Sequence, residues 1–344
     1  MKTKGRVIMM ALALVAALFF AALPAMAKDY LYVPVSNNLH IVDCDTDQII
    51  KTITYNDYIL NSTYSPDGSR YYLNAQDKIH VIDTDKNELI DTILFSTALN
   101  KVVLQGMSIS QDGSKLYLTG NITKKKRNIP KLNVVDPQFM VFDLKTKKLV
   151  KSYPITMGMT AIVPIYNDPD SVFLFGLDLF KLNIKTGKKT KIMGFLNPMK
   201  GQEPLNALIN WQNTSPGDHG IFTVPVYTPT AMKYMFVDKN VGKVSLLDTK
   251  DMWFAYSSTL SPDKKYLYAV MDELIKVDAK TGKTLKAVPV EEGTCYAVTI
   301  TSDGKKVYAG PGGNDLSVYN AADLKLLGVI PLAADGDAIH RISK

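Results

Sequence analysis

The sequence predicts an all-β protein, a seven-bladed β-propeller of four-stranded antiparallel blades. A turn-and-strand unit repeats along the chain with a period in the forties, which is typical of propeller blades. The acidic residues comprise 28 Asp and only 5 Glu. Because Asp favours turns whereas Glu favours helices, this bias also indicates short strands joined by turns. The length of 344 residues and the apolar fraction of 46% exclude an intrinsically disordered chain.

The first 27 residues have the pattern of a secretory signal peptide. Lys2, Lys4 and Arg6 precede an uncharged apolar run over residues 7–23, and Ala25-Met26-Ala27 is a small-residue cleavage motif. We therefore expect cleavage after Ala27 and export of residues 28–344. The alternative is an uncleaved anchor, since 17 apolar residues just reach across a bilayer.

Charge and cysteine content exclude several classes of protein. Removing the three cations of the leader from the total of 40 leaves 37 against 33 acidic residues, a net charge of +4. This weak excess does not predict nucleic-acid binding. Two cysteines at positions 44 and 295 cannot make a disulfide framework, a Cys-rich zinc site or a haem-attachment motif. We expect Cys44 and Cys295 to be buried packing residues; a bridge between them is the alternative.

The repeat unit has a physical explanation at each step. One copy begins with Ser65-Pro66-Asp67-Gly68, in which Pro presets φ and Gly supplies a permissive φ. Strand-length β-branched and aromatic segments follow at residues 70–73 and 78–83. The strand-ending residues Asp43, Asp83, Asp143, Asp248 and Asp278 recur once per blade, so we expect them to cap hairpin turns.

Counting the copies gives seven blades in a single domain, residues 28–344. A partial blade at 29–54 shows three strands, and complete blades lie near 58–95, 103–155, 159–195, 205–249, 254–290 and 294–332. The missing inner strand is predicted at residues 337–342. The C-terminal strand would then join the N-terminal blade, close the ring and cover its edges.

Two blades carry insertions, which we expect to form surface loops. Residues 121–137 hold the basic cluster Lys124-Lys125-Lys126-Arg127, and residues 213–233 lengthen the fifth blade. A solvated loop is one interpretation of the basic cluster. An electrostatic docking patch for an acidic partner is the other.

Catalytic motifs are not found, whereas aromatic residues cluster. His40, His80, His219 and His340 lack the spacing of a metal site, and no nucleophile elbow, phosphate loop or dinucleotide fingerprint occurs. Catalytic, cofactor-binding and metal-binding residues are therefore not assigned.

The aromatic residues instead predict a partner interface or the wall of a substrate pocket. Trp211, Asn213, Trp253, Tyr256 and Tyr296 lie in an insertion or near the starts of inner strands, where propeller partners dock. The alternative for Trp253 is packing between blades.

Several segments carry a resemblance to known families. Residues 32–43 (YVPVSNNLHIVD) resemble exported propellers with a YVTN-type repeat. Residues 205–228, with the core Asn206-Ala207-Leu208-Ile209-Asn210-Trp211, together with 252–262 and 296–331, resemble the β subunit of quinohemoprotein amine dehydrogenase. This resemblance extends over essentially the whole chain after the leader.

The resemblance implies a periplasmic heterotrimer that oxidises primary amines to aldehydes and ammonia. The partners would be a dihaem cytochrome α subunit, which carries haem c, and a small γ subunit with a cysteine tryptophylquinone. This chain would hold no cofactor, scaffold the small subunit and wall the substrate pocket. Two alternatives stay open: a stand-alone periplasmic YVTN-type propeller that binds a protein or an envelope component, and a lactonase-like propeller enzyme with a channel metal.

Overall fold

The computed structural model describes residues 27–127, 129–156, 158, 161–208, 220–290, 293–336 and 338–344. The predicted signal peptide lies outside the described residues, apart from Ala27, as do Trp211 and Asn213. Within the described ranges, no helix is long and apolar enough to cross a membrane.

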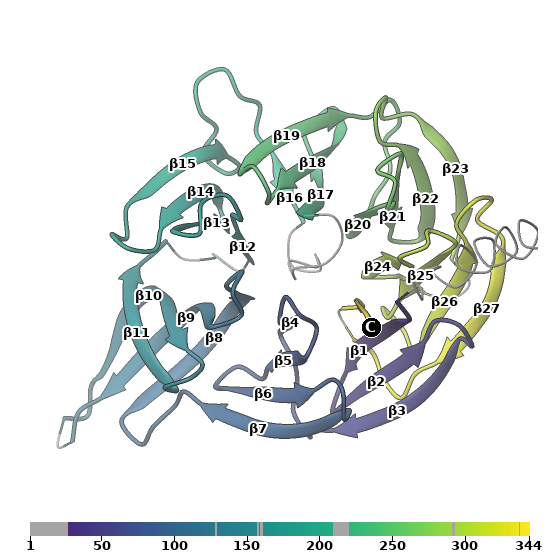
Figure 1. The fold of residues 1–344 in the computed structure, drawn as a ribbon. Coiled ribbons are helices and arrows are strands. Elements are labelled where there is room, and N and C mark those ends of the chain that lie inside the picture. Colours follow the sequence, from purple (N-terminus) through teal and green to yellow (C-terminus); the bar gives the residue numbers. More distant parts are fainter. Residues whose placement is uncertain are drawn as a thin grey trace, which may run out of the picture.

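Seven four-stranded antiparallel sheets form a ring, which confirms the predicted propeller (Figure 1). From the centre outward, the first four blades consist of β28 (His340–Ser343), β1 (Asp29–Val35), β2 (Asn38–Asp43) and β3 (Gln48–Thr54); β4 (Asn61–Tyr64), β5 (Arg70–Asn74), β6 (Lys78–Asp83) and β7 (Glu88–Leu94); β8 (Asn100–Ile109), β9 (Lys115–Lys125), β10 (Leu132–Asp143) and β11 (Lys148–Pro154); β12 (Ala161–Pro164), β13 (Ser171–Phe175), β14 (Asp178–Asn183) and β15 (Lys189–Gly194).

The remaining three blades follow the same order. They consist of β16 (Asn206–Ala207), β17 (Ile221–Tyr227), β18 (Met232–Asp238) and β19 (Lys243–Asp248); β20 (Ser257–Leu260), β21 (Tyr266–Val270), β22 (Glu273–Asp278) and β23 (Thr284–Pro289); β24 (Ala297–Ile300), β25 (Lys306–Gly310), β26 (Asp315–Asn320) and β27 (Leu326–Pro331).

The C-terminal strand closes the ring as predicted. β28 pairs antiparallel with β1, and Tyr30 lies opposite Ile342. The closing strand begins at His340, three residues later than the predicted start at 337. Since β28 supplies the inner strand of the first blade, the two ends of the described chain lie side by side (Figure 1).

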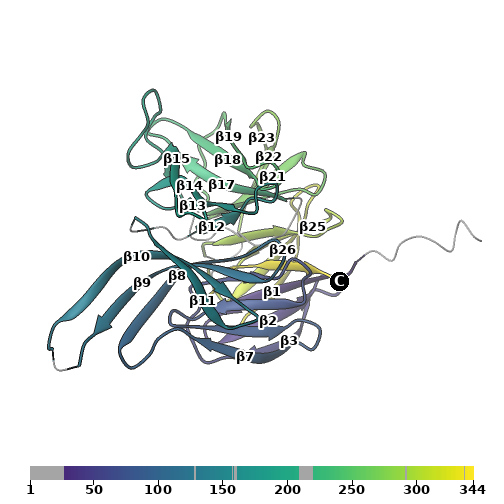
Figure 2. The ribbon, with the colours of Figure 1, turned by 60° about the vertical axis from the view of Figure 1, so that its left-hand side comes forward.

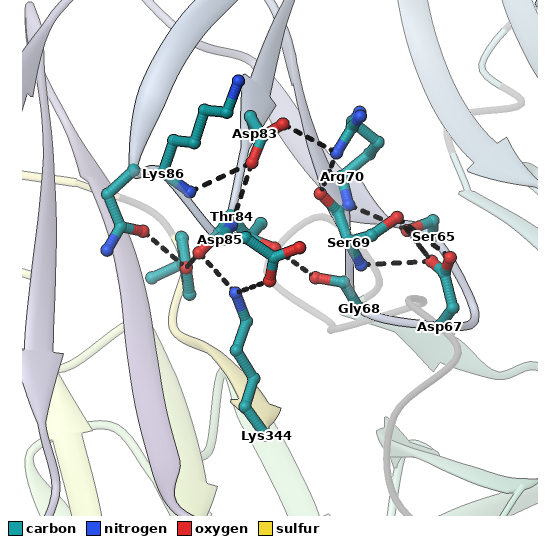
Figure 3. A network of polar contacts seen from close by, with 12 residues as sticks. Ser65, Asp67, Gly68, Ser69, Arg70, Asp83, Thr84, Asp85, Lys86 and Lys344 are labelled. Atoms are coloured by element: carbon teal, nitrogen blue, oxygen red, sulfur yellow. Dashed lines mark hydrogen bonds and ion pairs between the residues drawn. The ribbon is translucent and has the colours of Figure 1, made fainter.

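Polar side chains shape the turns between strands. Ser65 Oγ donates a hydrogen bond to the Asp67 carboxylate and accepts one from the Arg70 amide at 2.9 Å (Figure 3). Gly68 in the same turn adopts a φ of 70°. The same Ser/Thr–Asp pair shapes the turns at Ser110–Asp112, Ser261–Asp263 and Thr301–Asp303. The repeated turn motif therefore folds each blade locally.

The predicted hairpin caps are correct except in the fifth blade. Asp43, Asp83, Asp143 and Asp278 each accept backbone N–H groups of the following turn. Asp248 does not belong to this set, because it ends the outer strand β19 and pairs with Lys233. The equivalent residue is Asp238, which ends β18 and accepts the Asn240 amide at 2.9 Å.

The apolar core lies between the blades rather than within them. Each of the seven blade boundaries has its own cluster of buried side chains among the described residues. Cys44 packs at the boundary between the seventh and first blades, and Cys295 at that between the sixth and seventh. Both are buried free thiols, so the packing interpretation is confirmed and the Cys44–Cys295 bridge does not form.

Tyrosine and lysine side chains also tie neighbouring blades together. At four boundaries they donate to backbone carbonyls in the hairpin between the third and fourth strands of the next blade. The pairs are Tyr32 with Lys344, Tyr153 with Lys151, Tyr268 with Lys276, and Tyr308 with Lys306. Figure 3 shows Lys344 donating to the Thr84 carbonyl in this way; its Nζ also contacts the Asp85 carboxylate at 2.9 Å.

The sequence predicts a surface loop at residues 121–137. The structure instead shows an extension of the third blade. β9 and β10 continue outward as a hairpin, in which Lys125 pairs with Leu132 and Ile122 with Val135, and β8 runs alongside from Asn100. β-Branched residues at these positions favour a sheet despite the lysines. Figure 2 shows this extension projecting from the ring; we call residues 100–104, 121–127 and 129–136 the arm.

The second predicted insertion, 213–233, is wrong over its described part. Residues 221–227 form the regular strand β17, and Met232 already begins β18. The misassignment has the same origin as that of Asp248: residues 208–220 separate β16 from β17, whereas only residues 65–69 separate β4 from β5, so the fifth blade lacks the usual spacing of its repeat.

Candidate functional site

Antiparallel blades give the ring two chemically different faces. The turn face carries the Ser/Thr–Asp turns. The opposite loop face carries the connections between blades and the hairpins that join the second and third strands of each blade. Residues 249–256 lead into β20 and residues 290–296 lead into β24, so the described aromatic residues of the predicted site lie on the loop face.

Phe254 is the most exposed aromatic side chain of this region. It is 68% exposed, and its ring stacks on that of Tyr227 with centroids 5.8 Å apart. Tyr227 Oη donates to the Ala255 carbonyl at 2.9 Å and accepts the Ala255 amide at 2.6 Å. Burial raises the pKa of Tyr227, which keeps the hydroxyl protonated. These contacts hold the connection that leads into β20 in place and leave the Phe254 side chain exposed to solvent.

Trp253 points the opposite way. Its Nε1 donates to Thr284 Oγ1 at 3.1 Å, and its ring packs half-buried against the cluster between the fifth and sixth blades, which includes Tyr234 and Leu267. This position corresponds to the interblade packing that the sequence left open for Trp253. Trp253 therefore fixes the connection that leads into β20, while the side chain of the neighbouring Phe254 stays exposed for contact with a partner.

The structure brings Tyr256 and Tyr296 together. Their ring centroids are 5.4 Å apart with planes inclined at 59°, and both side chains are half-buried. The pair links the connections that enter the sixth and seventh blades. Their role in a partner interface or a substrate pocket stays a prediction, as does that of Trp211 and Asn213.

An apolar groove adjoins Tyr227 between the fourth and fifth blades. It encloses about 550 Å³ and is lined mainly by Leu177, Phe195, Leu196, Pro204, Leu205 and Tyr227. Leu177 is 46% exposed and Leu196 66%. No described residue that lines the groove is charged. Such a concave, uncharged surface suits the apolar side chains of a partner or the carbon skeleton of a ligand.

The described histidines have structural partners or buried positions. His80 contacts Asp57 Oδ2 at 2.8 Å and Thr92 Oγ1 at 2.9 Å, while His40 contacts Thr52 Oγ1 at 2.9 Å. His340 is buried in the closing strand. In the part of the chain that the structure describes, no three His, Cys, Asp or Glu residues are grouped to hold a metal ion.

Sequence reasoning missed Phe254 and the groove beside it. In the extended segment 253–255, Trp253 and Ala255 point inward, so Phe254 between them points outward. This alternation of inward and outward side chains is the sequence signal that could have identified Phe254 as exposed. The groove has no local signal, because its wall combines a hairpin of the fourth blade, the following connection and a hairpin of the fifth blade.

Comparison with known proteins supports the fold at low sequence identity. No protein-family model and no curated protein matches the chain. The solved structure of the dihydro-heme d1 dehydrogenase NirN in complex with DHE is similar with a TM-score of 0.58 and 12% identity, over 92% of this chain and 75% of that one.

Two further solved structures share the fold. A functionally unknown protein from Desulfotomaculum acetoxidans has a TM-score of 0.61 and 11% identity, over 92% of this chain and 98% of that one. Hydrazine synthase from Kuenenia stuttgartiensis has a TM-score of 0.53 and 17% identity, over 87% and 90%. The chain is a seven-bladed β-propeller whose structural neighbours include redox enzymes.

Proposed function

We propose that this propeller is a non-catalytic subunit that binds a partner protein on its loop face. The observation that supports this most directly is the uncharged groove of about 550 Å³, with Leu196 exposed on its wall and Phe254 stacked on Tyr227 beside it. Exposed apolar side chains gathered at a concave surface are typical of interaction sites, whereas scattered ones are not. A fixed aromatic side chain such as Phe254 loses little conformational entropy when a partner covers it.

We further propose that the partners belong to a periplasmic quinohemoprotein amine dehydrogenase. The sequence resemblance supports this assignment, and the neighbours named as a dehydrogenase and a synthase are compatible with an oxidoreductase subunit. The dihaem cytochrome and the small quinone-bearing subunit would carry haem c and cysteine tryptophylquinone. The signal-peptide pattern of residues 1–27 supports the location.

In this proposal the loop face performs two tasks for the complex. The groove and Phe254 hold the small subunit through apolar contacts. The Tyr256–Tyr296 pair, with Trp211 and Asn213, forms part of the wall beside the primary amine. An apolar wall with a few hydroxyl and amide groups suits an alkyl or aryl amine, because the carbon skeleton is desolvated while the amino group remains with the quinone subunit.

The test is purification of the tagged chain from the periplasm of its native host, followed by staining for haem and for redox-active quinone. The expected result is a haem-positive band and a small quinone-positive band in fixed ratio with the propeller. Leu196→Ser and Phe254→Ser should lose these bands. Val329→Ser is the matched control, because Val329 is 45% exposed on the outer strand β27, away from the groove.

A single band at the mass of the propeller, with no amine-dependent dye reduction, would overturn the heterotrimer. That outcome would favour a stand-alone YVTN-type propeller that binds a protein or an envelope component. Retention of both partner bands by Leu196→Ser and Phe254→Ser would instead show that the partners dock elsewhere.

A further inference from the structure

The arm lacks the fourth strand that every blade of the ring possesses. β11 pairs with β10 only from Gln138 to Asp143, whereas β9 pairs with β10 out to Leu132. The outward-facing backbone groups of residues 132–135 therefore have no hydrogen-bond partner among the described residues. Such a row of free N–H and C=O groups is a template for an added strand.

The residues of this edge do not prevent another strand from pairing with it. Leu132, Asn133, Val134 and Val135 carry no charge, although charged residues are the usual means of blunting an exposed edge. Leu132 is 57% exposed and Val134 71%. These two side chains share one face of the strand, because side chains alternate between faces. An added strand would cover both.

Positive charge surrounds the edge. Residues 121–137 contain Lys124, Lys125, Lys126, Arg127 and Lys131 against Asp136 alone, a net charge of +4 that equals the whole excess of residues 28–344. No ion pair engages these five cations in the described ranges of the chain. Lys125 lies opposite Leu132 and Lys124 opposite Asn133. A strand added to β10 would lie about 10 Å from β9, within reach of lysine side chains.

We propose that an extended acidic segment of a partner protein adds to residues 132–135 of β10 as the fourth strand of the arm. Its apolar side chains cover Leu132 and Val134, and its carboxylates meet the lysines of β9. Pro130 and Pro137 bracket the edge, which limits the added strand to about five residues. This inference does not rest on the amine dehydrogenase assignment, because no described residue of the arm lines the groove.

Two other occupants fit the arm less well. Insertion into a membrane would place the free backbone groups of residues 132–135 in hydrocarbon, where each unsatisfied group is costly. Edge-to-edge pairing with a second copy of this chain would bring two arms of net charge +4 together. An acidic strand satisfies both the backbone groups and the charge.

The experiment uses a capped seven-residue peptide of alternating Val and Glu as the probe for residues 28–344. Two further peptides carry N-methyl groups on all Val or on all Glu amides. In an added strand, alternate amides point toward β10 and away from it. We expect one methylated peptide to bind like the parent and the other at least tenfold more weakly. Hydrogen exchange at residues 132–135 should slow when the parent peptide binds.

A charge variant tests the electrostatic part. Replacing Lys124, Lys125, Lys126 and Arg127 by Gln should weaken peptide binding at least tenfold at about 50 mM salt. The control replaces by Gln four exposed lysines on outer strands and turns, for which no ion pair occurs among the described residues: Lys51, Lys148, Lys283 and Lys325. This control should bind the peptide within about twofold of the unmodified chain.

Four outcomes would overturn the proposal. No binding of the parent peptide up to about 1 mM would exclude strand addition with useful affinity. Equal binding of both methylated peptides would show that the peptide binds through a diffuse electrostatic contact and not through strand pairing. Co-sedimentation with phosphatidylglycerol vesicles that the peptide does not inhibit would assign the arm to a membrane. A concentration-dependent dimer that the quadruple arm variant strengthens and the parent peptide does not disperse would assign it to a second copy.

Discussion

The hydroxyl group of Tyr308 donates a hydrogen bond to the carboxylate of Asp47 at 2.6 Å, across the boundary between the last and first blades. Lys306 reaches the same carboxylate at 2.6 Å and also the Cys44 carbonyl at 2.9 Å. The seventh blade thus holds the hairpin between β2 and β3 through side chains. Ring closure therefore depends on these contacts as well as on the strand β28.

Replacing Tyr308 by Phe should lower the free energy of unfolding by about 1–2 kcal/mol, because a hydrogen bond to a charged group is lost. Tyr72→Phe is the matched control. Tyr72 occupies the same register in the second blade and is buried, but its hydroxyl has no hydrogen-bond partner within the described part of the chain. Urea unfolding measures both variants; equal losses would contradict the role of the Tyr308–Asp47 bond.

Acid should lower the free energy of unfolding because of the buried His340. Burial against Tyr64 and Tyr71 lowers the pKa of His340 to about 3. The unfolded chain takes up this proton near pH 6.5, whereas the folded chain does not, so stability is complete above pH 6.5 and falls as the pH decreases toward 3. The slope from this residue is about 1.4 kcal/mol per pH unit.

His340→Phe should remove that slope. Urea unfolding between pH 7 and 4 compares the two proteins, and the difference between their profiles isolates His340 from the carboxylates that titrate in both. Parallel profiles would show that His340 does not control acid stability.

Trp253 and Phe254 should separate stability from binding. Trp253→Ala should cost about 2 kcal/mol, since a half-buried ring and its hydrogen bond to Thr284 are lost. Phe254→Ser should change stability by less than about 0.5 kcal/mol, because the ring is exposed, yet weaken partner binding at least tenfold. Urea titration and co-purification measure the two effects. A Phe254→Ser protein that unfolds as early as Trp253→Ala would argue that Phe254 is structural.

The two thiols should be inert in the folded protein. Burial raises the pKa of both Cys44 and Cys295 to about 12, so neither forms a thiolate near neutral pH. A thiol reagent at pH 8 should label neither residue until denaturant unfolds the chain, and then both. A reducing agent should leave the melting temperature unchanged. Rapid labelling of the native protein would contradict the buried positions.

Gly120 should control the root of the arm. A Cβ atom there would lie 2.6 Å from the Val103 carbonyl oxygen, next to the register shift between β8 and β9. Gly120→Ala should therefore cost about 1–3 kcal/mol and speed hydrogen exchange in residues 121–125. Gly328→Ala is the control, because a Cβ at that position meets no atom within 4 Å. Similar costs for both variants would exclude a close approach at Gly120.

Local patterns predicted the blades because each blade is encoded locally. The turn at residues 65–68 and the strand-ending Asp83 form hydrogen bonds within a few residues of themselves, so their motifs are visible in the sequence. The fifth blade was harder to predict. Residues 208–220 lie between its first two strands and break the usual spacing of the repeat, so the sequence places the cap at Asp248 instead of Asp238.

Features that arise between distant segments could not be predicted in the same way. The sequence predicts a loop at residues 121–137 because insertions in propellers map to surface loops, although pairing of Ile122 with Val135 makes this segment a sheet. The proximity of Tyr256 to Tyr296 and the groove beside Tyr227 depend on contacts between neighbouring blades. Sequence suggested aromatic residues of the right region, but not which of Trp253 and Phe254 faces outward.

The pairing of β28 with β1 also determines when the protein can finish folding. Tyr30 and Ile342 are 312 residues apart in sequence, yet they face each other in one sheet. The first blade remains three-stranded until β28 has been synthesised, and its unpaired β1 edge is exposed until then. Contacts of such sequence separation form slowly, because a long loop must close first. Folding of the nascent chain should therefore pass through an open arc that becomes a ring in its last step.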